Sequence, residues 1–103
     1  MLSAQFYILF SLLDGEKHGY AIMKAVEQDT HKRLKLGPAT LYTNLKKMLS
    51  QKLIEETEQE KPGEERRRYY RLTDSGRTMV QDELKHLEET VRLGQQRQRG
   101  MGL

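Results

Sequence analysis

The segment that decides the fold is residues 37–48, which read GPATLYTNLKKM. Its proline suits the first turn of a helix, where the missing N–H would have no partner in the helix anyway. The apolar side chains that follow recur at helical spacing: Leu41, Leu45, Met48 and Leu49. Threonine, asparagine and lysine fill the other side. The segment therefore predicts a helix from Pro38 to about Gln51 that packs on a core with one face and presents a short, polar, basic face outward.

Helical patterns precede this segment, and strand patterns follow it. Residues 4–13 are almost continuously apolar and residues 18–28 carry a broad apolar face, so each predicts a helix. Residues 53–59 and 67–72 are typical of short strands, and the turn signal at residues 61–64 would join them as a hairpin. Tyr69 and Tyr70 are adjacent on the second strand and must face opposite sides. We expect Tyr70 in the core and Tyr69 exposed.

A long helix is predicted from Thr73 to about Gly94. Thr73 suits its N-cap, and Gly76 in its first turn indicates close packing or a permissive backbone. Its apolar side chains recur at the spacing of a coiled-coil seam: Val80, Leu84, Leu87 and Val91. This seam predicts pairing with a second copy of the chain, although it could instead pack on the first helix of its own subunit. The polar tail at residues 95–103 is expected to be mobile.

The order of these elements is helix, helix, helix, hairpin, long helix. It predicts a fold that is mainly α with a β-hairpin, namely a winged helix-turn-helix followed by a long C-terminal dimerisation helix. We assign residues 1–72 to the winged helix-turn-helix domain, residues 73–94 to the dimerisation helix and residues 95–103 to the tail. A chain of 103 residues has a modest core, because it buries only about 60–65% of its unfolded surface. Association with a second copy would add to that core.

Composition excludes several classes of protein. The absence of cysteine rules out a disulfide scaffold and thiolate metal or redox chemistry. No apolar stretch is long enough to span a membrane, and the N-terminus lacks the pattern of a signal peptide, so we expect the cytoplasm. The sequence shows no nucleophile–base arrangement, glycine-rich phosphate loop or set of metal ligands. Neither an enzyme nor a bound metal or cofactor is therefore expected.

Positive charge is concentrated in two segments. The formal net charge is only +3, yet residues 30–54 carry six basic side chains and no acidic one. Residues 61–71 carry five basic side chains against two acidic ones. Two basic segments in one small domain could build a single surface that faces phosphates, although ordinary solvated charge would give the same counts.

The central helix and the hairpin would together present this surface to double-stranded DNA. A major groove about 12 Å wide admits such a helix, whose threonines and asparagine can bond base edges while its lysines contact phosphates. Side chains alternate along a strand, so either Arg66 and Arg68 or Arg67 alone would point at DNA. The candidate DNA-binding residues are Pro38, Ala39, Thr40, Tyr42, Thr43, Asn44, Lys46, Lys47, Lys61, Arg66, Arg67 and Arg68.

Four motifs are specific when they are taken together. They are His18-Gly19-Tyr20-Ala21-Ile22, Gly37-Pro38-Ala39-Thr40-Leu41-Tyr42, Leu45-Lys46-Lys47-Met48 with Leu53-Ile54, and Arg68-Tyr69-Tyr70-Arg71-Leu72-Thr73-Asp74-Ser75-Gly76. In this order and spacing, the chain resembles the PadR family of winged-helix transcriptional regulators over about residues 4–90. The resemblance implies a homodimeric DNA-binding regulator, usually a repressor, whose last helix crosses to the partner subunit. It also implies that Thr40, Tyr42 and Lys46 lie at the DNA, and that Tyr70 and Thr73 support the junction between hairpin and last helix.

The single long helix at the end is similar to the short subgroup of that family. Some short members take flat aromatic drugs between tryptophans at the dimer interface, and this sequence has no tryptophan. Together these features predict a sequence-specific repressor that binds a pseudo-palindromic operator as a homodimer and is relieved by a small hydrophobic effector. Phe6, Phe10 and Leu87 are the candidate walls of the effector pocket. The alternative is a winged-helix module that binds an acidic protein partner through the same basic face.

Overall fold

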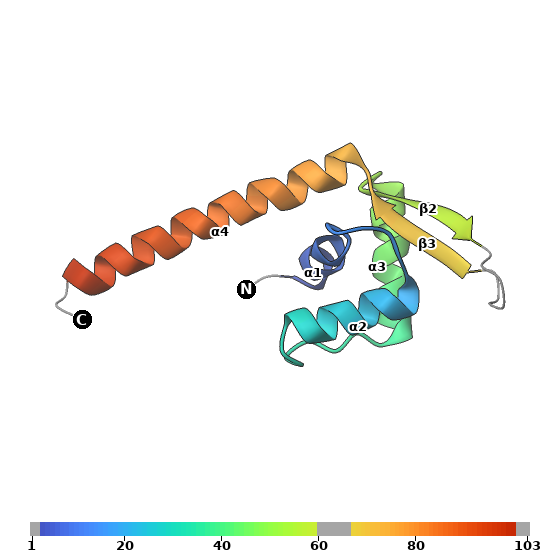
Figure 1. The fold of residues 1–103 in the computed structure, drawn as a ribbon, viewed down its shortest axis with the longest axis horizontal. Helices are drawn as coiled ribbons and strands as arrows, with labels where there is room; N and C mark the ends of the chain where they lie inside the picture. Colours follow the sequence, from blue (N-terminus) through green and yellow to red (C-terminus); the bar gives the residue numbers. More distant parts are fainter. Residues whose placement is uncertain (1–2, 60–66, 101–103) are drawn as a thin grey trace.

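Helices and short strands follow one another in the computed structural model, which describes residues 3–59 and 67–100 (Figure 1). The elements are α1 (Ala4–Ser11), β1 (Lys17–His18), α2 (Gly19–Asp29), α3 (Pro38–Ser50), β2 (Ile54–Gln59), β3 (Arg67–Leu72) and α4 (Asp74–Gly100). The predicted fold class is confirmed: the fold is mainly helical, β2 and β3 form a hairpin, and a long helix closes the chain. The turn predicted at residues 61–64 lies outside the described residues.

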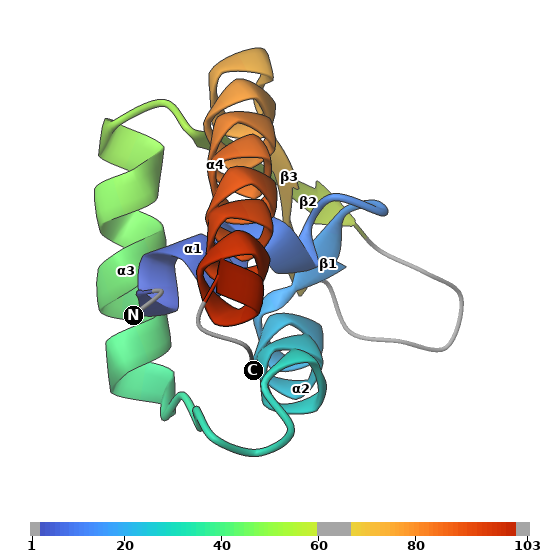
Figure 2. The ribbon, with the colours of Figure 1, turned by 90° about the vertical axis from the view of Figure 1, so that its left-hand side faces the viewer.

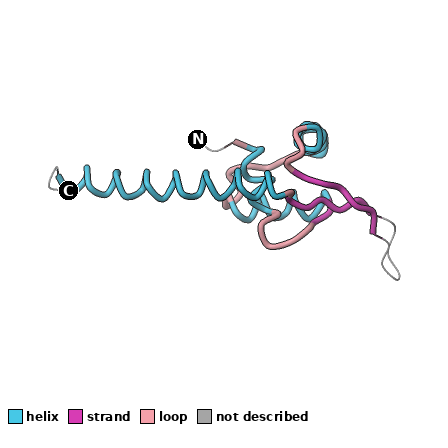
Figure 3. Tube along the Cα trace, turned by 90° about the horizontal axis from the view of Figure 1, so that it is seen from above, coloured by secondary structure: helices cyan, strands magenta, loops and turns pink. Residues whose placement is uncertain are grey.

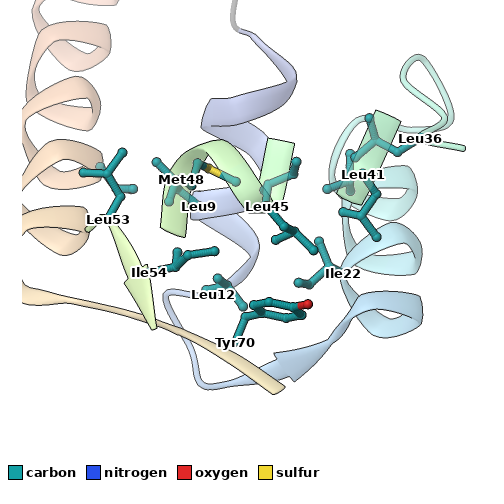
Figure 4. Packing of buried hydrophobic residues seen from close by; sticks show 13 residues of the cluster. Leu9, Leu12, Ile22, Leu36, Leu41, Leu45, Met48, Leu53, Ile54 and Tyr70 are labelled. Atoms are coloured by element: carbon teal, nitrogen blue, oxygen red, sulfur yellow. The ribbon is translucent and has the colours of Figure 1, made fainter. Parts of the chain in front are cut away.

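One apolar core holds α1, α2, α3, the sheet and the start of α4 together. Figure 4 shows side chains of these elements converging, with the ring of Tyr70 beside Leu12 and Ile22. The largest fully buried side chains are Ile8, Leu9, Leu12, Ile22, Val26, Leu41, Leu45, Met48, Ile54 and Val80. Full burial of one such side chain contributes about 1.5–3 kcal/mol. The three that belong to α3 therefore fix this helix on the core by one face and leave its other face outward.

The central strand of the sheet is β3, which pairs with β1 on one side and β2 on the other. Both pairings are antiparallel, and Tyr69 lies opposite His18 on β1 and opposite Thr57 on β2. The sequence pattern does not predict β1, because two residues are too few to show an alternation of apolar and polar side chains. This short strand ties the start of α2 to the hairpin.

The expectation that Tyr69 is exposed is wrong. Tyr69 is only 8% exposed and Tyr70 only 3%. The pairing with β1 accounts for the difference, because the imidazole of His18 packs edge-on against the Tyr69 ring with 5.4 Å between the ring centroids. Tyr70 lies in the core as predicted.

Two helices end at other residues than the sequence predicts. α1 ends at Ser11 rather than residue 13, and the Ser11 hydroxyl donates to the carbonyl oxygen of Ile8 at 2.6 Å. α4 continues to Gly100, so its predicted end near Gly94 is wrong and residues 95–100 are helical. Glutamine and arginine are good helix formers, and arginines favour the C-terminal end of a helix dipole. The apolar period that guided the prediction stops earlier than the helix does.

Thr73 and Gly76 join the start of α4 to the start of β2. The Thr73 hydroxyl accepts from the Gly76 N–H at 3.0 Å, as predicted for an N-cap, and donates to the carbonyl oxygen of Lys52 at 2.7 Å. A Cβ at position 76 would lie 2.0 Å from the carbonyl oxygen of Leu53. The close packing predicted at Gly76 is confirmed, because any side chain there would force the backbone of the junction to move.

The far half of α4 leaves the core and gives the molecule its long axis. The molecule measures 59 × 27 × 24 Å, and α4 projects from the remaining elements in two perpendicular views (Figures 1 and 3). Val80 near its start is fully buried, whereas Val91 and Leu93 are 58% and 41% exposed. The helix therefore belongs to the core at one end and carries uncovered apolar side chains toward the other.

Candidate nucleic-acid interface

The outward face of α3 is polar and exposed along its whole length. Its exposed residues are Pro38, Ala39, Thr40, Tyr42, Thr43, Lys46 and Lys47. Asn44 is half-buried, and its side-chain N–H donates to the carbonyl oxygen of Thr40 at 2.9 Å. The amide oxygen of Asn44 remains as an acceptor, so this face offers hydroxyl donors and acceptors in the middle and ammonium groups toward its end.

The connection between α2 and α3 sets α3 beside α2 (Figure 2). The Thr30 hydroxyl donates to the carbonyl oxygen of Val26 at 2.8 Å and accepts from the N–H of Leu34 at 3.1 Å. His31 and Lys32 then adopt φ values of 52° and 66°, a left-handed conformation that reverses the chain. Leu36 is buried, so the connection is anchored before α3 begins. This geometry is the predicted helix-turn-helix.

The two described arginines at the start of β3 face opposite sides of the hairpin. Arg67 lies with Nη1 2.9 Å from Nε2 of His18, on the side of Tyr69. Arg68 lies on the same side of the strand as Tyr70, because side chains two apart share a face. Lys61 and Arg66, also predicted at the interface, lie outside the described residues.

Several cations of this surface carry no ion pair. Within residues 3–59 and 67–100, no acidic side chain pairs with Lys46, Lys47 or Arg68. Arg71, by contrast, is held by Glu55 with 3.0 Å between Nη2 and Oε2. The unpaired cations are free to neutralise phosphates, and each such contact releases counterions from a nucleic acid.

A hollow of about 350 Å³ lies where α2, α3 and β3 meet, and its lining is His18, Gly19, Tyr20, Tyr42, Arg67, Arg68 and Tyr70. A Cβ at Gly19 would lie 2.7 Å from the hydroxyl oxygen of Tyr42, so glycine lets this phenol reach the start of α2. The Nδ1 atom of His18 accepts from the N–H of Ala21 at 3.2 Å and caps the helix. The sequence patterns did not place His18, Gly19, Tyr20 or Tyr70 at a binding surface. The motif at residues 18–22 was the only signal for the first three.

The hollow also contains a phenol with an altered acidity. Burial raises the pKa of Tyr70, and the nearby Glu56 carboxylate and Tyr42 phenol raise it further, while Arg68 acts in the opposite direction. A phenol with a raised pKa stays protonated at neutral pH. The Tyr70 hydroxyl is therefore a hydrogen-bond donor.

The four residues of the predicted dimerisation seam are in different surroundings. Val80 packs inside the core of its own chain, as the other interpretation of the seam expected, and presents no surface to a partner. Leu84 is partly buried against the same core. Leu87 is half-buried and Val91 is exposed. Only the later part of the seam is therefore open to a second molecule.

The predicted walls of the effector pocket do not form one pocket in the single chain. The rings of Phe6 and Phe10 stack with centroids 5.7 Å apart. Phe6 lines a hollow of about 400 Å³ between α1 and α4, whereas Phe10 borders a different hollow between α1 and α2. Leu87 borders neither of these two hollows.

The described residues contain neither a group of metal ligands nor a membrane-spanning helix. No three histidine, aspartate or glutamate side chains of residues 3–59 and 67–100 are grouped so that they could hold a metal ion. In the same part of the chain, no helix has both the length and the apolar composition needed to cross a membrane.

Comparison with protein families matches residues 8–82 to the Transcriptional regulator PadR-like family. This match spans α1 to the first turns of α4, and thus the helix-turn-helix, the hairpin and the hollow. The chain belongs to the PadR-like family. Members of this family are transcriptional regulators rather than enzymes, so the expectation that the chain is not an enzyme is confirmed. The resemblance based on the four motifs is confirmed as well.

Solved structures of transcriptional regulators share this architecture. A PadR family transcription regulator from Clostridium difficile is 25% identical, with a TM-score of 0.75, and the alignment covers 89% of this chain and 94% of that one. A transcriptional regulator from Clostridium thermocellum is also 25% identical, with a TM-score of 0.72 and 90% of both chains covered. PadR from Bacillus subtilis, solved in complex with operator DNA, is 26% identical with a TM-score of 0.68, over 78% of this chain and 45% of that one.

A curated relative of greater sequence identity extends well beyond the matched PadR region. An uncharacterized 37.1 kDa protein in transposon TN4556 of Streptomyces fradiae is 38% identical over 80 residues, which is 78% of this chain. The aligned part covers only 21% of that relative. The chain therefore spans about a fifth of the length of this relative.

Proposed function

We propose that this chain is a sequence-specific DNA-binding regulator that inserts α3 into the major groove of duplex DNA. The observation that carries the proposal is the division of α3 into two faces. Leu41, Leu45 and Met48 are at most 1% exposed, whereas the threonines, Tyr42 and the lysines are exposed. Within residues 3–59 and 67–100, no acidic side chain pairs with these lysines. The operator complex of the related PadR from Bacillus subtilis supports a DNA-binding role for this architecture.

Each exposed residue of α3 has a role that follows from its chemistry. Thr40 and Thr43 can donate to and accept from base edges, and the methyl-like surfaces of Pro38 and Ala39 suit a thymine methyl group. Lys46 and Lys47 suit phosphates, which position the protein without carrying sequence information. Arg67 and Arg68 of the hairpin would follow the backbone beside α3 or enter the adjacent minor groove.

We infer further that the chain binds as a homodimer through α4. Leu87, Val91 and Leu93 offer apolar surface that one chain leaves uncovered. Charge along α4 is split: residues 74–89 carry five acidic side chains against two basic ones, and residues 90–100 carry three basic side chains and no acidic one. A second α4 running antiparallel would place the basic end, with Arg97 and Arg99, beside the acidic stretch.

Such a two-fold dimer would read a pseudo-palindromic operator. Its two α3 helices would enter successive major grooves, with half-site centres about 34 Å apart. Occupancy would block polymerase, so the expected outcome is repression, exerted in the cytoplasm where a bacterial-type operator is found. A small hydrophobic effector bound near Phe6, in the hollow between α1 and α4, would relieve repression by changing the separation of the two α3 helices.

The test is binding of the full chain to a duplex of its own upstream region, measured by fluorescence anisotropy against a scrambled duplex of equal length. Thr40→Ala and Thr43→Ala should each reduce the preference for the upstream duplex by about 1–3 kcal/mol. Ser50→Ala, also on α3 but at its far end, is the matched control. A wild-type chain that binds neither duplex, yet binds an acidic protein through Lys46 and Lys47, would overturn the proposal in favour of the protein-binding alternative.

A further inference from the structure

The hollow between α2, α3 and β3 gathers hydrogen-bond donors from three elements. Arg68 contributes a guanidinium, and Tyr42 and Tyr70 contribute phenol groups. Gly19 and Tyr20 contribute the first turn of α2. Donors that converge from separate elements on one space are the usual design of an anion site, because each alone binds weakly.

The Tyr70 hydroxyl is the most informative of these groups. The residue is 97% buried, being 3% exposed, and it lines the hollow. Among residues 3–59 and 67–100, no protein group hydrogen-bonds to its hydroxyl, which is open to the hollow. Figure 4 shows its ring packed beside Leu12 and Ile22 with the oxygen directed away from the β3 backbone. Its ring is buried in the core while its hydroxyl faces the hollow, so the hydroxyl can donate to a ligand there.

The start of α2 adds a second, independent attraction for an anion. The N–H groups of the first turn of a helix have no partner within the helix, and the helix dipole places partial positive charge there. The Nδ1 atom of His18 takes one of these N–H groups, that of Ala21. Gly19 is buried, and its missing side chain lets the Tyr42 hydroxyl pack against this end of the helix.

We propose that this hollow binds one phosphate group of the DNA backbone and so sets the register of α3 in the groove. The inference rests on the proposed function and deepens it. The hollow lies between α3 and the hairpin, the two elements that would flank a single DNA strand. A phosphate held there by Tyr70 and Arg68 carries no base information, but it decides which bases Thr40 and Thr43 reach.

Two carboxylates lie near enough to oppose the anion. Glu56 is opposite Tyr70 and Glu58 is opposite Arg68 across the hairpin, and both are exposed. Glu56 acts electrostatically on Tyr70. Its negative charge offsets part of the positive potential of the hollow, so its removal should strengthen phosphate binding.

The experiment replaces one phosphate of the bound duplex at a time with a neutral methylphosphonate. Tyr70→Phe removes one hydroxyl and keeps the buried ring, and it should weaken binding to the unmodified duplex by about tenfold. At one phosphate in each half-site, methylphosphonate should weaken wild type by a similar factor and leave Tyr70→Phe unaffected. Arg68→Ala should show the same loss of sensitivity at the same phosphate.

Matched controls separate a phosphate contact from a loss of structure. Tyr7→Phe removes a phenol hydroxyl from α1, and Arg71→Ala removes a positive charge from the other face of β3; both should retain the full methylphosphonate pattern. The unfolding temperature of Tyr70→Phe is measured in parallel. Losses that simply add at every phosphate, or unchanged affinity of Tyr70→Phe, would overturn the inference while DNA binding by wild type stands.

Removal of the negative charge of Glu56 should raise the affinity for DNA, which gives a second test. Glu56→Gln should bind the unmodified duplex about fivefold more tightly. Most of that gain should vanish when the phosphate identified above is neutral. Glu55→Gln makes the same change in net charge on the other face of the hairpin and should give a smaller gain. Equal gains for both variants would count against the hollow, whereas a wild type that binds no duplex would instead remove the proposed function itself.

Discussion

The exposed faces of helices α3 and α4 differ in the kind of partner that each would bind. In α3, the whole apolar stripe is buried inside its own chain: Leu41, Leu45 and Met48 are at most 1% exposed. In α4, Val80 is also buried in its own chain, but Val91 is 58% exposed. The outward face of α3 thus suits a polar, anionic partner. The projecting part of α4 with Leu87, Val91 and Leu93, here called the α4 arm, suits an apolar one.

This difference teaches that one chain can contain two binding surfaces of opposite chemistry on elements of the same type. A polar face with unpaired cations gains from counterion release, so its binding depends on salt. An uncovered apolar face gains from the removal of that surface from water, which depends much less on salt. Substitutions on the outward face of α3 should therefore leave self-association through α4 intact. Substitutions that disrupt α4 pairing should weaken operator binding, because the operator would be read by a dimer.

The largest expected effect is that of salt on the α3 surface. If the dimer makes about 6–10 phosphate contacts, DNA affinity should fall by about 10³–10⁵-fold between 50 and 200 mM salt. Lys46→Ala should flatten the slope by about one contact per subunit while lowering affinity for all sequences alike. Anisotropy titrations over a salt series measure both. A salt dependence near zero would contradict the proposed difference between α3 and α4, because α3 would then bind a partner through contacts other than phosphates.

A smaller effect is expected when the α4 arm is made polar. Leu87→Asp with Val91→Asp should weaken self-association by about 3–6 kcal/mol, because the dimer loses four apolar side chains that are already about half-covered in the single chain. The core of each chain should stay folded. Sedimentation velocity should then report a mass near the 12.1 kDa of one chain. Thr78→Asp, on the opposite side of α4, is the control and should stay associated. Unchanged association of the double variant would exclude this face from the interface.

The two ends of α4 should also respond differently to the same substitution. Gly76→Ala forces a Cβ against the Leu53 carbonyl oxygen, so it should destabilise the fold by about 1–3 kcal/mol. Each kcal/mol corresponds to about 4–8 °C in the unfolding temperature for a domain of this size. Gly94→Ala meets open space and should raise helix stability by about 0.5–1 kcal/mol. Thermal unfolding followed by circular dichroism measures both, and equal effects would contradict the close packing at Gly76.

The smallest effect is expected from the exposed ion pair of α4. The Arg92 guanidinium, hydrogen-bonded to Glu89 with 2.9 Å between Nε and Oε2, lowers the pKa of that carboxyl. Because the folded-state pKa is lowered, the stabilising contribution is present above the unfolded pKa and is lost as pH falls through the folded one. The difference in unfolding temperature between wild type and Glu89→Gln should therefore shrink to zero in acid. A difference that grew in acid would reverse the assigned sign.

Much of the fold could be predicted because its elements are periodic. The stripe of α3 predicted its buried side, and Thr73 predicted the cap of α4, since both signals are local in sequence. The polar face of α3 was predicted for the same reason. The hollow could not be predicted, because Gly19, Tyr42 and Tyr70 meet only after the hairpin has paired with β1.

The sequence by itself determined which of the longer segments become helices and strands, which face of each is apolar, and that positive charge gathers on α3 and the hairpin. These properties depend on neighbours within a turn or two of the chain. Only the tertiary structure decided that β1 would bury Tyr69, that Val80 would join its own core, and that Tyr70 would direct its hydroxyl into a hollow. Those outcomes depend on contacts between residues far apart in the chain, and no local period encodes them.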